Sequence, residues 1–314
     1  MGGLRVSNEV ILAKIETTYN TDATPAAASD AILVRNVDMR PEGLRMVDRA
    51  AIRGGLGRLQ QIYGGQLKRI TFECEVKGSG SAGTAPEIGA LLQACGMDET
   101  VVASTSVTYT ATNSSHKSVT IYYYEGGRKL HKITGARGTV TLRAEAGGIL
   151  LAAFEFVGHY GGVSDSSQPT PTYNSQVPRA LVGLSVSLNG VTAIVARSWE
   201  WALNNTIALP PSMSASDGYS ELIITERNVT GEILIESELS STIDVDTLLS
   251  GGTRFAFASG TIGSSAGNRV AVSTPASSTY VTDQALDAAD GLRLRRVPLA
   301  VDDSVANSFS IEFT

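Results

Sequence analysis

Long hydrophobic runs are missing from this 314-residue chain. The longest, residues 149–154, stops at Glu155 and is far too short to cross a membrane as a helix. The N-terminal residues carry Arg5, Glu9 and Lys14 without a long apolar core, so we expect neither a signal peptide nor a membrane partner.

Lysine is absent from the second half of the chain. Residues 163–314 hold 8 Arg against 16 acids, a net charge of −8, whereas residues 1–162 hold 17 basic and 15 acidic residues, a net of +2; the two sum to −6. Proteins that bind DNA regardless of sequence need clustered Lys and Arg, because displaced counterions supply the affinity. An acidic half repels a polyanion, so we expect no lasting, sequence-independent binding of DNA.

Cysteine and histidine are scarce. Cys74 and Cys95 lie in a predicted strand and a predicted helix, and we interpret them as reduced and buried, with a disulfide as the alternative. His116, His131 and His159 are far apart and lack the i, i+4 pairing of a helical metal site. His131 is interpreted as a solvated strand residue. The sequence therefore predicts no metal site.

Two glycine motifs look catalytic at first sight. Residues 78–83 match the dinucleotide-binding pattern G-x-G-x-x-G, but the predicted helix begins only at Pro86, after the motif. Residues 263–267 match G-x-S-x-G, whose fold needs a later histidine, and the last histidine is His159. We predict no catalytic residue and no cofactor: the chain is not expected to be an enzyme.

The chain is rich instead in β-strand patterns. Residues 106–110, 118–124, 130–133, 139–143 and 150–157 alternate polar with β-branched or aromatic residues, and Gly-rich turns separate them. Period-two alternation of this kind predicts an antiparallel meander. Trp199 and Trp201 share one face of a later predicted strand, which favours packing in a core or an interface.

Two similar halves flank a segment rich in Ser, Pro and Gly. This segment predicts a linker over residues 163–178 between modules 1–162 and 179–314. Loose matches at a nearly constant offset, such as residues 154–156 with 311–313, suggest an internal duplication, and two unrelated β domains stay open. The predicted fold is mainly β, with two tandem sandwich or barrel modules, each carrying one short helix.

The predicted elements follow the same plan in each module. The first helix is expected over residues 86–96, with Glu87 complementing its dipole, and the second over 245–250. Further strands are predicted over residues 8–13, 31–39, 68–77, 184–188, 194–203, 219–225, 230–238, 254–259, 269–273, 292–300 and 308–314.

Residues 38–66 form an unusually long predicted loop. Its charges are mixed, and the candidate residues for an interface with a copy in an adjacent layer of an assembly (an inter-ring interface, if the copies form rings) are Arg40, Glu42, Arg45, Asp48, Arg49, Arg53 and Arg58. Long loops without structure of their own are uncommon in compact domains and are usually functional or disordered. We interpret this one as an arm that becomes ordered against a neighbouring copy. The alternative is a flexible loop without such a contact.

Several stretches together point to a family. They are Ile-Leu-Ala-Lys-Ile-Glu-Thr-Thr-Tyr at 11–19, Tyr-Tyr-Tyr-x-Gly-Gly at 122–127, Thr-Gly-Ala-Arg-Gly-Thr-Val at 134–140, Phe-Glu-Phe-Val-Gly at 154–158 and Pro-Thr-Pro-Thr-Tyr at 169–173. The chain resembles the major tail tube protein of long, non-contractile-tailed, siphovirus-type bacteriophages, in a two-module form. The resemblance is specific in the first half and looser in the second, where residues 283–296 depart most.

The resemblance implies a structural virion protein with tandem tail-tube-like modules. Such proteins stack as rings into the tail tube that conducts DNA from capsid to host cell. The implied partners are further copies of the chain and the tape measure, terminator and distal tail proteins. The implied location is the virion tail, after synthesis in the host bacterial cytoplasm. Three copies would close a ring with pseudo-sixfold symmetry, and a ring of six chains is the runner-up. A decoration or surface-binding module is the alternative function.

The acidic strand 230–238 is a candidate lining for the tube. Residues two apart share a face of a strand, so Glu232, Glu236 and Glu238 should project together while Ile233 and Ile235 face the core. Glu73 and Glu75 are their counterparts in the first module. Like charges on DNA and protein would prevent sticking. A solvated outer face is the alternative.

Overall fold

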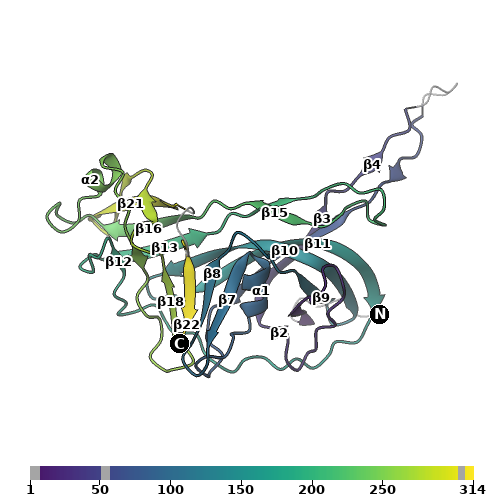
Figure 1. Cartoon of the computed structure of the whole chain (residues 1–314), viewed down its shortest axis with the longest axis horizontal. Helices are drawn as coiled ribbons and strands as arrows, with labels where there is room; N and C mark the ends of the chain where they lie inside the picture. The colour runs from purple at the N-terminus through teal and green to yellow at the C-terminus, as the bar shows by residue number, and fades with distance from the viewer. Residues whose placement is uncertain (1–7, 51–56, 303–307) are drawn as a thin grey trace.

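The computed structural model describes residues 8–50, 57–302 and 308–314, and it is mainly β with two short helices (Figure 1). The strands form two large sheets and two small two-stranded ribbons. The large sheets face each other with the core between them, and the helices α1 (Gly89–Ala94) and α2 (Val245–Ser250) lie beside them.

The larger sheet has twelve strands and runs through both halves of the chain. Its main path, in spatial order, is β19 (Thr279–Val281), β21 (Leu292–Val301), β16 (Thr230–Glu236), β13 (Ala196–Ala202), β10 (Lys129–Glu145), β11 (Leu151–Asp165), β6 (Leu67–Glu75) and β3 (Val34–Glu42). Off this path lie β1 (Val10–Ile15), β2 (Ala31–Ile32), β9 (Val119–Glu125) and β20 (Ala285–Ala289).

The smaller sheet has six strands and also mixes the two halves. Its order is β12 (Ser187–Leu188), β17 (Phe257–Ala258), β18 (Val270–Ser273), β22 (Ser310–Phe313), β8 (Ser106–Ala111) and β7 (Met97–Val102). The ribbons pair β4 (Met46–Val47) with β5 (Ile62–Tyr63) and β14 (Thr206–Ala208) with β15 (Ile223–Glu226).

One hydrophobic core serves both halves. β10 of the first half pairs with β13 of the second, from Thr141 opposite Ala202 to Glu145 opposite Ser198, and β8 pairs with β22 in the other sheet. The connecting residues 166–179 form no helix or strand. A division into modules at 163–178 therefore stays a prediction, because both sheets and the core continue across it.

The predicted meander is partly wrong. β9, β10 and β11 do pair in sequence order, but β8 leaves them for the other sheet, between β7 and β22. The glycine-rich stretch at 135–138 is not a turn either. β10 continues through it, with a shift of register between Thr134 and Arg137. A β-bulge bends a strand without ending it, which is why the local pattern resembles a turn.

The helices agree with the prediction in place but not in every detail. α2 has the predicted bounds, and the Asp244 side chain caps it by accepting from the backbone N–H of Thr247. α1 is shorter than predicted, and Glu87 lies before it rather than at its first turn. The Glu87 carboxylate is buried and lies 3.5 Å from the ammonium group of Lys77, and its burial raises the pKa of Glu87.

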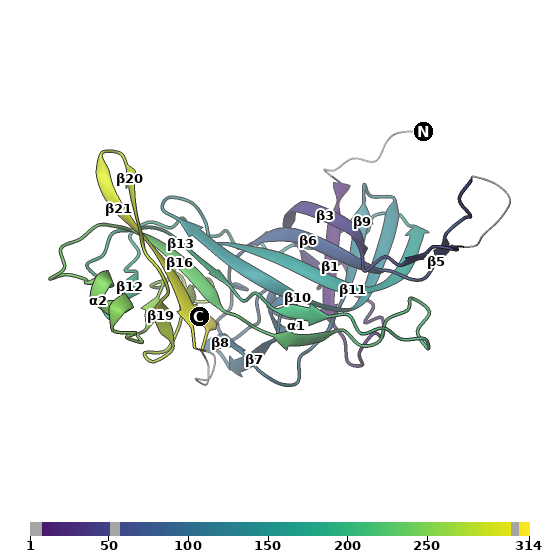
Figure 2. The same cartoon turned by 90° about the horizontal axis from the view of Figure 1, so that it is seen from above.

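Two long connections leave the large sheet, each joining a pair of antiparallel neighbours. The first arm, residues 43–66, joins β3 to β6, and the second arm, residues 203–229, joins β13 to β16. The first arm projects from the body, with β4 and β5 along it, whereas the second arm runs back over β10 and β11 (Figure 1). Figure 2 shows the first arm at one end of the long axis and the β20–β21 hairpin at the other.

The two tryptophans pack in the core, as their shared face predicts. The ring centroid of Phe257 lies 5.2 Å from that of Trp201 and 5.8 Å from that of Trp199, so the smaller sheet meets β13 through these rings. All three side chains are buried.

Removing the Phe257 ring should strongly destabilise the fold. Phe257 is 0% exposed, and Phe257→Ala should lower the free energy of unfolding by about 3–5 kcal/mol, through lost transfer energy and the cavity left behind. Chemical denaturation checks this, with the exposed Leu286→Ala as the control that changes stability by less than about 0.5 kcal/mol. A similar small effect for both variants would contradict the shared core.

Candidate interaction surfaces

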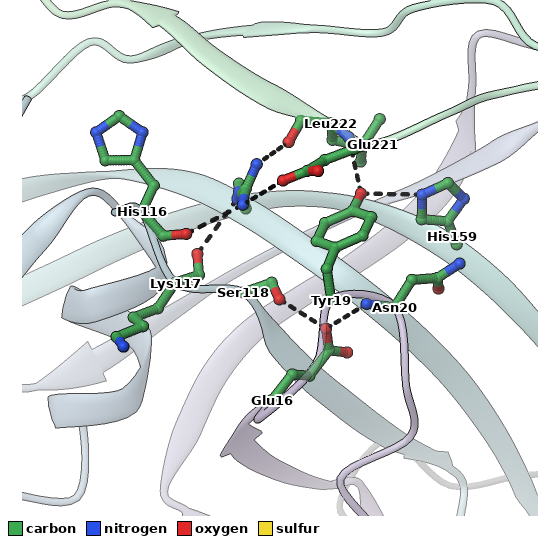
Figure 3. Close-up of polar contacts among 10 residues, drawn as sticks. Glu16, Tyr19, Asn20, His116, Lys117, Ser118, His159, Glu221 and Leu222 are labelled. Atoms are coloured by element: carbon green, nitrogen blue, oxygen red, sulfur yellow. Dashed lines mark hydrogen bonds and ion pairs between the residues drawn. The ribbon is translucent and has the colours of Figure 1, made fainter. Parts of the chain in front are cut away.

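The turn after β1 is held by a buried carboxylate. Glu16 is 5% exposed. Its oxygens accept four hydrogen bonds, from the backbone N–H groups of Gly135 (2.7 Å) and Asn20 (2.8 Å) and from the hydroxyls of Ser118 (2.7 Å) and Thr120 (2.8 Å). Bonds to an ionised group offset its desolvation. This network fixes the turn that presents Tyr19 to the second arm (Figure 3).

Arg137 joins the first half to the second arm. It lies in β10 just after the bulge and is 7% exposed. Its guanidinium donates to the Glu221 carboxylate (2.8 Å) and to the carbonyl of Leu222, both in the arm. It also donates to the carbonyls of His116 (3.0 Å) and Lys117 (3.4 Å), and Figure 3 shows these groups converging. The planar guanidinium suits such a site because it carries five donors.

Tyr19 and His159 complete the polar contact with the second arm. The Tyr19 hydroxyl accepts from the backbone N–H of Leu222 (2.7 Å) and lies 3.0 Å from His159 Nε2 (Figure 3). His159 Nδ1 lies 2.5 Å from the Asp217 carboxylate. Burial, the largest cause, raises the pKa of Tyr19 to about 12.

An apolar cluster lies next to these polar groups. Leu67 of β6 and Val157 of β11 are buried beneath Tyr219 and Leu222 of the second arm. The second arm thus covers part of the outer face of the large sheet, the face turned away from the main core. Apolar burial and charge-assisted hydrogen bonds act together to hold it there.

The same part of the second arm holds the base of the first arm. The Tyr219 hydroxyl donates to the carbonyl of Gly43, and the Arg45 guanidinium lies 4.1 Å from the centre of the Tyr219 ring. Arg45 also donates to the carbonyl of Gly218 (3.2 Å). A Cβ on Gly65 would collide with the carbonyl of Asp217, so only glycine allows this close approach.

Beyond its base the first arm is a hairpin, so the prediction of an irregular loop over residues 38–66 is wrong at both ends. Residues 38–42 belong to β3, and Met46 pairs with Tyr63 and Val47 with Ile62. These four apolar side chains are half exposed, and so is Leu44. The sequence prediction rested on mixed charge and scattered apolar residues, and it did not foresee that Met46 and Val47 pair with Tyr63 and Ile62.

The charged residues predicted for the loop interface have varied surroundings. Arg40 pairs with Arg69 in the sheet, Glu42 accepts from Arg69 Nε (2.7 Å), and Asp48 and Arg58 form an ion pair across the arm (3.0 Å). Arg49 is exposed, and Arg53 lies outside the described residues. The exposed Asp48–Arg58 ion pair contributes little to stability, so both residues are available for contacts between molecules.

The candidate lining acids share the outer face of the large sheet. Ile233 and Ile235 face the core as predicted, with Glu232 and Glu236 on the other side; Glu238 lies past the end of β16. Glu73 and Glu75 alternate with buried residues of β6 in the same way. Four of the ion pairs on this face are Glu73–Arg35 (2.9 Å), Glu200–Arg143 (2.8 Å), Glu232–Arg296 (2.6 Å) and Glu236–Arg197 (3.0 Å). The face therefore carries paired charges rather than bare acids.

The remaining predicted residues have structural surroundings. His131 is buried, not solvated: its ring nitrogens lie 3.0 Å from the Tyr160 hydroxyl and 3.0 Å from the Glu125 carboxylate. Cys74 and Cys95 are free and buried, and burial raises the pKa of both thiols. In the described ranges, no three His, Cys, Asp or Glu side chains gather as a metal site would need, and no helix there could span a membrane.

The chain matches a protein-family model. A family model described as phage tail tube protein matches residues 7–312, which is nearly the whole chain. A comparison with curated proteins finds no match.

The contact between Tyr19 and the second arm should make stability depend on alkaline pH. The folded-state pKa of about 12 lies above the ordinary value of 10, so the unfolded chain ionises first. The stability advantage of the wild type over Tyr19→Phe should be full below pH 10 and shrink between pH 10 and 12. Urea denaturation at several pH values measures it. A difference that stays constant over this range would contradict the burial of the hydroxyl.

Proposed function

This chain belongs to the phage tail tube protein family, and from that premise we propose that its copies close into rings that stack as the tube conducting DNA. As a member of the family it is a structural component of the virion tail, which assembles with itself and with other tail proteins. The proposal extends to a long, non-contractile tail, with the tape measure, terminator and distal tail proteins as neighbours. Synthesis in the host cytoplasm is part of the same proposal.

The two open ends of the main path of the large sheet support this ring, with β19 and β20 at one end and β3 at the other. Within the described residues, β3 pairs with β6 alone and β20 with β21 alone. Unpaired backbone groups at a sheet edge favour pairing with another chain. If the β3 edge of one copy pairs with the β20 edge of the next, a closed ring satisfies both edges in every copy.

Three copies are the proposed content of a ring. Along the large sheet the first half contributes β3, β6, β11 and β10, and the second half contributes β13, β16 and β21 with β19 and β20 beside it. The halves thus supply two similar units per chain, and three chains supply six. A ring of six full-length chains is the runner-up.

The first arm is proposed to contact other copies of the chain, both in the stacked ring and beside it in its own ring. It projects from the body, carries half-exposed apolar side chains on both strands, and holds Arg45, Asp48, Arg49 and Arg58 (Figure 1). Apolar surface of this kind in a chain that assembles marks an interaction site.

The outer face of the large sheet is proposed to line the bore. It carries Glu73, Glu75, Glu232 and Glu236, and the arginines beside Glu73, Glu232 and Glu236 are ion-paired with them. An arginine that is ion-paired with a glutamate binds a DNA phosphate less strongly than an unpaired arginine, because the glutamate already neutralises its charge. DNA would thus pass without being held.

Replacing the apolar residues of the first arm should abolish assembly without unfolding the chain. Met46→Ser, Val47→Ser, Ile62→Ser and Tyr63→Ser combined remove side chains that are already half exposed, so thermal unfolding should stay cooperative. Tubes should disappear in electron micrographs and sedimentation should give the free chain. The matched control changes exposed Val177 and Met213 to Ser. Normal tubes from the arm variant would exclude the arm as a contact.

Imaging and native mass of the purified protein test the ring. We expect tubes or rings whose building unit contains three chains. A unit of six chains would reject the trimer but leave the tube intact. A stable monomer at high concentration would instead favour the alternative function, a decoration or surface-binding module of the virion.

A further inference from the structure

The second arm shows how an arm of this fold can dock. It leaves the large sheet between β13 and β16 and lies across the preceding unit, β10 and β11, which is joined to β13 by backbone hydrogen bonds. There Arg137, Tyr19 and His159 bind its polar groups, and Leu67 and Val157 bind its apolar side chains. The second arm therefore docks on the strands that lie beside β13, the strand from which it starts.

Among the residues that the structure describes, the first arm has no such unit within its own chain. It is the same kind of connection, between the antiparallel strands β3 and β6, but β3 is the edge of the sheet. Beyond its base, its apolar side chains stay half exposed on both β4 and β5. A unit placed against the β3 edge would have to come from another molecule.

The second half presents an equivalent position at the opposite edge of the sheet. β19 and β20 pair along β21 as β10 pairs along β11. Near the connecting turns, Ala289 lies opposite Leu292 as Arg143 lies opposite Leu151. At the far end, Tyr280 lies opposite Ala300 as Arg137 lies opposite Val157. The strand end at Tyr280 thus corresponds to the docking site for the second arm.

A polar hollow lies at this equivalent position. Its volume is about 430 Å³, and Gly252, Arg254, Tyr280, Val301 and Asp302 line it. Arg254 is half exposed and lies 2.6 Å from the Asp302 carboxylate. The hollow thus combines an arginine and a tyrosine with an apolar wall, as the occupied docking site does with Arg137, Tyr19 and Val157.

Charge supports the first arm as the occupant. Residues 44–66 contain four Arg and one Asp, a net charge of +3, whereas residues 163–314 carry −8. Exposed Asp283 lies three residues after Tyr280 in the sequence, just past the end of β19. Opposite charges on two surfaces steer them together and exclude wrong partners.

We propose that the first arm of one copy docks across the second half of the neighbouring copy, in the hollow beside Tyr280. The second arm then lies on the first half of its own chain, and the first arm lies on the second half of the neighbouring copy. This inference rests on the proposed function, because it needs the β3 edge of one copy to meet the β20 edge of the next. It adds the place where the arm binds.

Cysteine cross-linking in assembled material tests the docking. The double variant Ile62→Cys and Tyr280→Cys is treated with a short bismaleimide, and Val47→Cys with Tyr280→Cys provides a second donor position on the same arm. Native Cys74 and Cys95 are buried and should not react. We expect covalent ladders of two or more chains from assembled protein and none from dilute monomer. The control pairs Ile62→Cys with Val177→Cys, an exposed position on the connecting segment.

The outcomes separate this inference from the proposed function. Tubes that form normally but give no ladder with either donor position, or an equal ladder with the Val177 control, would overturn the docking and leave the tube standing. Loss of assembly with Tyr280→Cys but not with Val177→Cys would support a contact at the hollow. A wild-type protein that never assembles would reject both.

Discussion

The pairing of β10 with β13 is the interaction on which the rest of the structure depends. Five residues of each strand, from Thr141 opposite Ala202 to Glu145 opposite Ser198, join the two halves into one sheet. Without this junction each half would end in an open edge and expose its side of the core. With it, Trp199 and Trp201 close a core that extends from the first half into the second. The main path of the continuous sheet then ends at β3 on one side and at β19 and β20 on the other.

A second constraint follows from the first. Once β13 lies beside β10, the second arm starts next to the first half and can bury its side chains there. The buried guanidinium of Arg137 and the hydroxyl of Tyr19 satisfy backbone groups of Leu222, which would otherwise be desolvated without partners. Glu16 holds the turn that carries Tyr19. Its carboxylate therefore supports the contact between Tyr19 and the second arm, roughly 200 residues later in the chain. These groups are structural, and their chemistry is that of an interface inside one molecule.

Much of the fold could be predicted from local pattern. The alternation of Ile233 and Ile235 with Glu232 placed that strand and both of its faces correctly, and the predicted helix over residues 245–250 has the bounds of α2. Other features could not be predicted, because they depend on partners distant in sequence. Nothing within residues 106–110 shows that β8 pairs with β22, and nothing near Arg137 shows that its neighbours form a bulge whose guanidinium binds residues 221 and 222.

By itself, the sequence determined the class of the protein: mainly β, without a membrane helix or a catalytic pattern, with an acidic second half and the residues of a tail tube family. Period-two patterning and turn residues act over a few positions, so they are readable in one chain. The tertiary structure decided that the two halves share both sheets, that the second arm is docked while the first projects beyond its base, and that Glu73, Glu232 and Glu236 among the candidate lining acids are ion-paired. These outcomes depend on which strands meet across the core, and that choice is made by packing and by backbone hydrogen bonds between distant segments.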